Sequence, residues 1–163
     1  MSSVIVTRVV SAPASVVWET FADLRARASW LSEVESVELL TPGPFALGTR
    51  WRETRRTGGG SSVTEELVIT AVEPGRSCTM TLVGSGTANH LTYVFASIDV
   101  GPHRGGTAVT AEAEAHTQGL ANRLLAFVLG GFAARTAEGA LRDELDALAA
   151  ASRARGSAGP AAA

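Results

Sequence analysis

The chain has one cysteine, one tyrosine and two methionines among its 163 residues, and neither sign of charge dominates. The single cysteine, Cys78, excludes an internal disulfide framework and is typical of a reducing compartment. It lies in an alternating apolar segment, which favours a buried thiol. One cysteine and three scattered histidines lack the spacing of zinc ligands, so we expect no metal and no other cofactor.

Charge and hydropathy argue against two further classes of partner. Lys and Arg number 14 against 16 Asp and Glu, whereas nucleic-acid-binding domains are usually basic. No apolar run approaches the roughly 18 residues of a membrane-spanning helix, and the N-terminal run is broken by Arg8. We therefore expect a soluble, cytoplasmic protein with no nucleic-acid partner and no stable membrane insertion, present as a monomer or weak homodimer.

Hydrophobic residues make up 45% of the chain and charged residues 18%, which predicts one packed globular domain. Residues 4–10 are almost all β-branched and predict a first strand. Pro13 then opens a helical pattern with an apolar stripe through Val17 and Phe21. This short helix is expected to end near Ala26.

The pattern then changes to period two and predicts six more strands, at 34–40, 49–56, 63–72, 76–83, 88–100 and 106–116. The turns between them are short and rich in Gly and Pro, which implies antiparallel pairing. Helical spacing returns from about residue 119 to about residue 150. The predicted fold class is α+β, a curved antiparallel sheet of about seven strands covered by a long C-terminal helix. Residues 1–152 would form the domain and 153–163 a flexible tail.

Several segments resemble the START/SRPBCC superfamily, and most closely its polyketide cyclase/dehydrase-like bacterial branch. After the apolar first strand the chain continues with SAPASVVWETFADL, then Trp30, then VESVELLTPGPFALGTRWRE. Three further parts complete the pattern: the strand–turn–strand segment TEELVITAVEPGRSCTM, the pair TYVF and GGTAVTAEAEAH, and the closing ALRDELDAL. The resemblance extends to about residue 150. It implies a helix-grip fold with a deep cavity for a hydrophobic or amphipathic small molecule.

Members of this superfamily include carriers, receptors and aromatase/cyclases, so the resemblance implies no single activity. We expect binding of a lipid-like or polyketide-like molecule between the sheet and the C-terminal helix. The alternative is a polyketide aromatase/cyclase or dehydratase that acts on a poly-ketone intermediate. A second alternative is a protein-interaction module that uses an exposed sheet edge. The sequence has no nucleophile elbow, phosphate loop or metal-ligand cluster that would demand catalysis.

Residues 48–56, GTRWRETRR, gather four arginines around one tryptophan and one glutamate. Alternation divides the segment into two rows of side chains. The outer, solvated row holds Arg50, Arg52 and Arg56. The inner row holds Trp51, Glu53 and Arg55, because the large tryptophan ring gains most from burial. The inner charged pair either forms a polar corner of the cavity or stays wet at an edge of the sheet. Glutamates of the following strand could pair with the outer arginines.

The predicted strand at 88–100 alternates in the same way. The face expected to point toward the helix carries Asn89, Leu91, Tyr93 and Phe95. Tyr93 is the only tyrosine, and its buried hydroxyl needs a partner, either a ligand or a backbone group. His90 falls on the opposite face, which argues against a catalytic role.

The C-terminal helix has an irregular apolar face. One stripe runs through Leu124, Val128 and Phe132 to Arg135, and a second continues through Gly131 to Leu141, Leu145 and Leu148. Gly130 and Gly131 lie where the stripe shifts, and each is unfavourable by roughly 1 kcal/mol relative to alanine in a helix interior. They either widen the space beneath the helix or kink it, or they let the sheet approach closely. Arg135 faces either the cavity or its rim.

Under the enzymatic alternative, Arg55 and Tyr93 would polarise a carbonyl, and Glu53 or His116 would transfer protons. His116 lies at the exit of the last strand, where it is either an acid–base group or a solvated loop residue. The residues predicted to line the cavity are Trp51, Glu53, Arg55, Leu91, Tyr93, Phe95, Leu124, Val128, Gly131, Phe132 and Arg135.

Overall fold

The computed structural model describes residues 2–56, 60–84, 89–115 and 137–159. The elements follow in the order β1 (Ser2–Val10), α1 (Ala14–Ala22), the 3-10 turn η1 (Leu24–Ala26), α2 (Arg27–Trp30), β2 (Val34–Leu39), β3 (Arg50–Arg56), β4 (Ser62–Glu73), β5 (Ser77–Leu82), β6 (Asn89–Ser97), β7 (Thr107–Ala115) and α4 (Ala137–Ser157). The predicted α+β class and helix-grip arrangement are confirmed.

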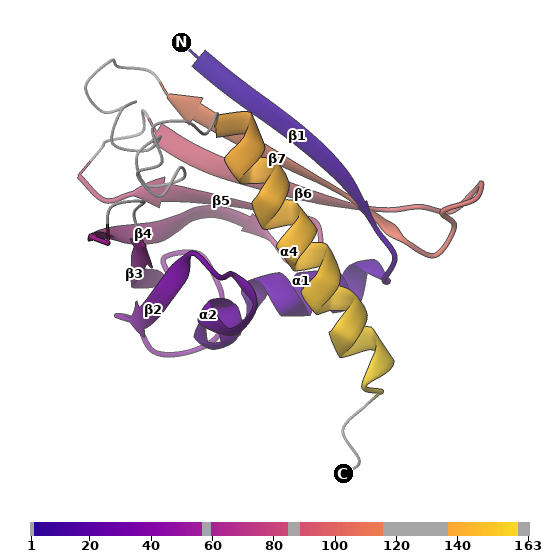
Figure 1. The fold of residues 1–163 in the computed structure, drawn as a ribbon, viewed down its shortest axis with the longest axis horizontal. Helices are drawn as coiled ribbons and strands as arrows, with labels where there is room; N and C mark the ends of the chain where they lie inside the picture. Colours follow the sequence, from indigo (N-terminus) through magenta and orange to yellow (C-terminus); the bar gives the residue numbers. More distant parts are fainter. Residues whose placement is uncertain (1, 57–59, 85–88, 116–136, 160–163) are drawn as a thin grey trace.

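The seven strands form one antiparallel sheet in the order β1-β7-β6-β5-β4-β3-β2, so β1 and β2 are its edges. The sheet curves around α4, which crosses its inner face (Figure 1). The register shifts between Val34 and Ser36 in β2, and again between Ile69 and Ala71 in β4. Such irregularities bend strands locally, which suits a sheet that wraps around a helix.

The helical segment after β1 differs from its prediction, because it is divided where one helix was expected. Helix α1 begins after Pro13, whose carbonyl accepts hydrogen bonds from the backbone N–H groups of Val16 and Val17. At Asp23 the backbone leaves the helical conformation, and the Asp23 carboxylate accepts from the N–H of Ala26. This local capping ends α1 and starts η1 and α2, which turn the chain toward β2.

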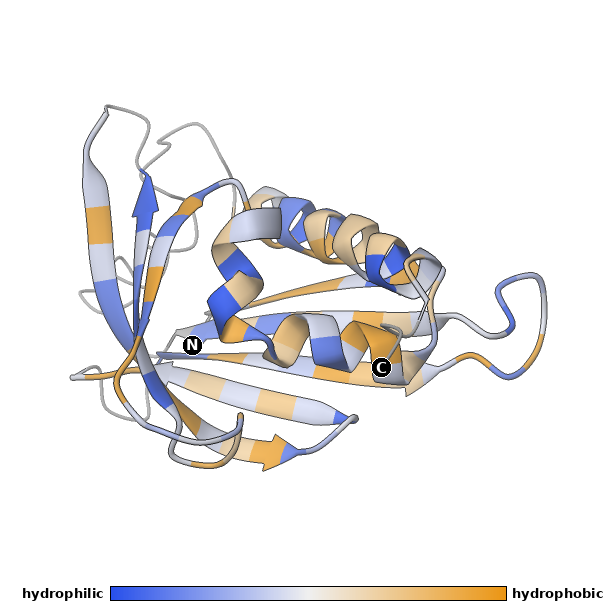
Figure 2. Ribbon diagram, turned by 90° about the horizontal axis from the view of Figure 1, so that it is seen from below, coloured by the Kyte–Doolittle hydropathy of each residue, from blue (hydrophilic) through white to orange (hydrophobic). Residues whose placement is uncertain are grey.

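The core lies between the inner face of the sheet and the helices. Buried leucines of α4 belong to this core, and α4 packs mainly against β1. Along the strands, hydrophobic and hydrophilic residues alternate in many places (Figure 2). The predicted apolar stripe through Leu141, Leu145 and Leu148 is buried in full. Helix α1 packs against α4 at one end of this core.

Helix α4 continues through Ser157, so residues 153–157 extend the helix beyond the predicted domain boundary. The flexibility of the residues after it remains a prediction. Within the described parts of the chain, no helix is both long and apolar enough to cross a membrane.

Candidate functional site

The segment GTRWRETRR forms β3, and its two rows separate as its alternation predicts. Trp51, Glu53 and Arg55 are 0%, 1% and 1% exposed, so the alternative of a wet sheet edge is wrong. The outer arginines form ion pairs with glutamates of the neighbouring strands β4 and β2. These pairs are Arg50–Glu66, Arg52–Glu38 and Arg56–Glu35. The inner row therefore brings two charged side chains into the core.

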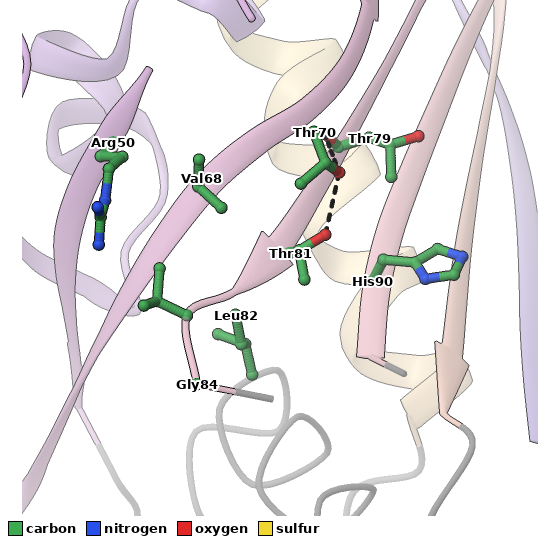
Figure 3. A pocket seen from close by; sticks show the side chains of 9 residues that line it. Arg50, Val68, Thr70, Thr79, Thr81, Leu82, Gly84 and His90 are labelled. Atoms are coloured by element: carbon green, nitrogen blue, oxygen red, sulfur yellow. Dashed lines mark hydrogen bonds between the residues drawn. The ribbon is translucent and has the colours of Figure 1, made fainter. Parts of the chain in front are cut away.

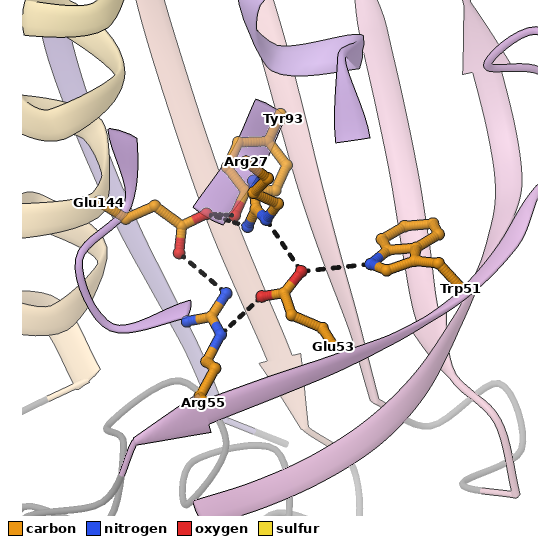
Figure 4. Close-up of polar contacts among 6 residues, drawn as sticks. All are labelled: Arg27, Trp51, Glu53, Arg55, Tyr93 and Glu144. Atoms are coloured by element: carbon orange, nitrogen blue, oxygen red, sulfur yellow. Dashed lines mark hydrogen bonds and ion pairs between the residues drawn. The ribbon is translucent and has the colours of Figure 1, made fainter. Parts of the chain in front are cut away.

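The inner charges belong to a closed ring of four buried side chains, Arg27, Glu53, Arg55 and Glu144, which we call the charge ring (Figure 4). Arg27 donates from Nε to Glu53 Oε2 at 2.9 Å and from Nη2 to Glu144 Oε1 at 2.8 Å. Arg55 donates from Nε to Glu53 Oε1 at 2.7 Å and from Nη2 to Glu144 Oε2 at 3.4 Å. Each carboxylate thus bridges both guanidinium groups, and the formal charges cancel.

Two aromatic side chains complete the ring. The Tyr93 hydroxyl donates to Glu144 Oε1 at 2.9 Å, and the Trp51 indole N–H donates to Glu53 Oε2 at 3.2 Å. All four carboxylate oxygens consequently accept hydrogen bonds. Buried ions are tolerable only when they are paired and hydrogen-bonded in this way. The ring joins α2, β3, β6 and α4 at one point of the inner face.

The ring stays ionised at neutral pH. Burial alone would raise the pKa of the Glu144 carboxyl, but Arg27 and Arg55 outweigh it and lower that pKa to about 2. The pKa of Glu53 is lowered against the same burial effect by the same two arginines. Burial and the charge of Glu144 raise the pKa of Tyr93 well above its ordinary value, so its hydroxyl stays protonated. Carboxylates with lowered pKa values are poor general bases.

An aromatic cluster adjoins the charge ring on the same face. Phe21 of α1 lies 4.7 Å from Tyr93 and 5.2 Å from Phe95, measured between ring centroids. Trp18 contacts Phe95 edge-on at 5.3 Å and Phe45 at 5.8 Å. Such edge-to-face packing makes this end of the inner face apolar. The face therefore combines an aromatic region with an internally neutralised polar one.

Arg27 and Glu144 were missed by the sequence analysis, although a signal for each was present. Arg27 follows Leu24 by three residues and precedes Leu31 by four, and both leucines are buried. Glu144 stands in the same relation to Leu141 and Leu148. A charge at an apolar position of a helical stripe predicts a buried, paired charge.

The other predicted site residues fall into two groups. Leu91, Tyr93 and Phe95 lie buried on the inner face, and the partner of the Tyr93 hydroxyl is a carboxylate and not a backbone group. His90 points to the outer face and lies 2.8 Å from Glu114. The candidates outside the described residues are His116, Leu124, Val128, Gly130, Gly131, Phe132 and Arg135.

A pocket of about 510 Å³ opens on the outer face of the sheet over β4, β5 and β6 (Figure 3). Threonines line much of it, with Thr70 and Thr81 joined by a hydrogen bond of 3.0 Å. Two of its lining residues, Arg50 and His90, contact Glu66 and Glu114. The pocket lies on the opposite side of the sheet from the predicted cavity.

Among the described residues, no group of His, Cys, Asp and Glu side chains could hold a metal ion.

Comparisons with known proteins agree with this fold. Residues 1–153 match the family described as "Polyketide cyclase / dehydrase and lipid transport". A comparison with curated protein sequences gave no match.

Three solved structures illustrate the similarity. TTHA0849 from Thermus thermophilus has a TM-score of 0.63 and 20% identity, with 96% of this chain and 98% of that one covered. A START superfamily protein from Mycobacterium smegmatis has a TM-score of 0.62 and 14% identity over 96% and 97% of the two chains. The di-domain ARO/CYC BexL from the BE-7585A biosynthetic pathway has a TM-score of 0.62 and 22% identity over 98% of this chain and 51% of BexL.

These structures share the fold, and the family match spans nearly the whole chain. The protein therefore belongs to the polyketide cyclase / dehydrase and lipid transport family, and its helix-grip fold is similar to that of a START superfamily protein.

Proposed function

We propose that the protein binds a hydrophobic or amphipathic small molecule on the inner face of its sheet, beneath the C-terminal helix. The observation that carries this proposal is the closed charge ring. Its four charged groups pair with one another, the Tyr93 hydroxyl donates to Glu144, and the carboxyl pKa values are lowered. An inner face of this kind offers apolar contact, and the charged groups of the ring are already engaged with one another.

The energetics favour an apolar ligand. Burial of the ligand's own apolar surface contributes about 25 cal/mol per Å² removed from water. A neutral ring needs no counter-charge from the ligand, because each guanidinium already contacts two carboxylates. The family description, which includes lipid transport, is consistent with this role.

A thermal-shift experiment tests the proposal with a panel of fatty acids, sterols and polycyclic phenols. A ligand that binds only the folded state must raise Tm, and we expect at least one compound to do so. Ala113→Phe would fill the inner face opposite Leu91 and should abolish the shift. Val94→Phe, on the outer face, should preserve it. If no compound raises Tm of the wild type, the binding function is wrong.

The alternative is catalysis of an aromatase/cyclase or dehydratase reaction on a poly-ketone. Similarity to the ARO/CYC protein BexL supports it, together with a hydroxyl and a guanidinium on one buried face. For this chemistry Tyr93 would have to exchange its hydrogen bond to Glu144 for one to a substrate carbonyl. Proton transfer by a positioned group contributes about 10²- to 10⁴-fold, so Tyr93→Phe should lower turnover by about that factor.

Tyr93→Phe is the clean test of this alternative, because Glu144 Oε1 keeps its bond from Arg27. The loss of one hydrogen bond should then cost only about 1 kcal/mol of stability. Arg55→Ala is less informative, since it leaves two carboxylates with one guanidinium and so destabilises the fold itself. Turnover of a poly-ketone that is unchanged in Tyr93→Phe would exclude the assigned role of Tyr93.

A further inference from the structure

Asn89 stands apart from the other polar residues of the inner face. It is the first residue of β6, its side chain is 0% exposed, and it shares the inward face of Leu91 and Tyr93. Neither its amide oxygen nor its amide nitrogen has a hydrogen-bond partner among the residues that the structure describes. Tyr93, on the same strand, has its hydroxyl bonded to Glu144. The Asn89 amide is therefore a polar group that the charge ring does not use.

The described strand residues next to Asn89 on this face are apolar. Leu91 follows it on the same face, Ala115 lies opposite it in register on β7, and Ala113 lies opposite Leu91. Leu82, one step beyond the last paired residues of β5 and β6, is also buried. A fully buried amide with both of its polar atoms unpaired is a rare and unfavourable arrangement in a folded protein. Its presence points to a partner outside the described residues, and a bound ligand would supply one.

The chemistry of the amide defines that partner. An asparagine side chain presents one acceptor and two donor hydrogens side by side. A hydroxyl group is complementary, because it donates to Oδ1 and accepts from the Nδ2 hydrogens through one oxygen. Since the neighbours are leucine and alanine, this hydroxyl must be carried on an apolar skeleton. The four charges of the ring already pair with one another, so they offer no free counter-ion to a charged ligand group.

We infer that Asn89 anchors the ligand by its hydroxyl group, and that the ligand is a neutral, largely apolar molecule that carries this hydroxyl. This inference rests on the proposed binding function and narrows its ligand class. Asn89 would then be a specificity residue at the start of β6. It separates hydroxylated ligands from hydrocarbons of the same shape.

Fluorescence titration with 2-naphthol and 2-methylnaphthalene tests this inference, because the two compounds differ by a hydroxyl in place of a methyl group. We expect the wild type to bind 2-naphthol about tenfold more tightly. In Asn89→Leu the ratio of the two Kd values should fall to about one or reverse. The matched control is Ser152→Ala, near the far end of α4. The Ser152 side chain is also fully buried and has no partner among the described residues. This variant should keep the wild-type ratio of the two Kd values.

The outcomes separate the two claims. Binding of both compounds with the same ratio in the wild type and in Asn89→Leu overturns the anchor and leaves the binding function standing. If neither compound binds the wild type, the anchor is overturned, and the binding function is overturned with it only when no compound of the thermal-shift panel raises Tm either. Should Asn89→Leu fail to fold, Asn89→Ala is titrated with the same pair and the same collapse of the ratio is expected. If neither variant folds, the amide serves the fold and the inference is wrong.

Discussion

Glu144 shows how a single side chain holds the inner face together. Its two carboxylate oxygens accept hydrogen bonds from Arg27, Tyr93 and Arg55, which come from three different elements. It is 4% exposed, so water cannot replace these partners. Loss of its charge would leave two buried guanidinium groups with one carboxylate, Glu53.

Glu144→Gln should therefore destabilise the protein strongly. Breaking a buried ion pair on one side typically costs about 3–5 kcal/mol, and we expect a loss in the free energy of unfolding of this size. Urea unfolding followed by tryptophan fluorescence measures it. The control is Glu138→Gln, which removes an exposed pair with Arg142 and should cost less than about 1 kcal/mol. Equal effects of the two substitutions would contradict the role of the ring.

The lowered pKa of Glu144 also predicts how stability depends on pH. Its folded-state pKa of about 2 lies below its ordinary value of 4.5, so the stabilisation is complete above pH 4.5 and is lost as the pH falls toward 2. A shift of this size corresponds to about 3 kcal/mol. Glu53 changes stability in the same direction. Urea unfolding between pH 2 and 6 should show a steep loss in the wild type and a shallower one in Glu144→Gln. Parallel profiles would contradict the prediction.

Cys78 should be chemically inert in the folded protein. It is 1% exposed, and burial raises the pKa of its thiol to about 12, although the charge of Arg27 acts in the opposite direction. Because the thiolate is the reactive form, Ellman's reagent at pH 8 should label the native protein only as fast as it unfolds. In guanidinium chloride one thiol per chain should react at once. Rapid, complete labelling of the native state would show that this account of Cys78 is wrong.

The contacts between individual side chains were the part of the structure that the sequence predicted least well. Alternation placed Trp51, Glu53 and Arg55 on the inner face, because the side-chain period of a strand is strict. It could not show which charges meet there, because the partners lie far apart in the chain. Arg27 precedes Glu53 by 26 residues, and Glu144 follows Arg27 by 117 residues. Such a ring depends on tertiary contacts that a local pattern does not contain.

At the scale of elements, the seven strands were predictable within a few residues. Their turns contain Gly and Pro, and their hydrophobic alternation is regular, so local chemistry and fold agree. The division of the first helical segment into α1, η1 and α2 was not predicted. It depends on the conformation of Asp23 and its bond to the N–H of Ala26, which helical periodicity alone does not reveal.

Two glycines in different elements give opposite predictions for the same substitution. A Cβ at Gly106, just before β7, would lie 2.7 Å from the carbonyl oxygen of Val10 and 3.0 Å from that of His103. These backbone atoms cannot easily retreat, so Gly106→Ala should cost about 1–3 kcal/mol. Gly156 lies in α4, where its nearest neighbour would be a Val16 methyl at 3.9 Å.

Gly156→Ala should therefore stabilise the protein, by up to about 1 kcal/mol, through helix propensity alone. Thermal unfolding of both variants beside the wild type checks the pair, with Tm lowered for Gly106→Ala and unchanged or raised for Gly156→Ala. A Gly106→Ala protein as stable as the wild type would mean that β1 and the β6–β7 hairpin are not packed as closely as described.

At the scale of the whole molecule, the sheet, the helices and the charge ring form a single buried face. The ring ties α2, β3, β6 and α4 together, and its own four charges cancel. The aromatic cluster and the Asn89 amide lie on the same face. A protein with this interior should select its ligand by shape and by hydroxyl position, with little help from charge.

The most direct test of this account is native mass spectrometry of the protein purified from its own host under gentle conditions. We predict a second charge-state series, heavier than the chain by the mass of one small molecule. This series should be lost in Ala113→Phe and kept in Val94→Phe. Extraction should yield a neutral compound with at least one hydroxyl group. If the protein appears only at the mass of the bare chain, and none of the lipophilic compounds tested raises its Tm, the proposed ligand-binding function is contradicted.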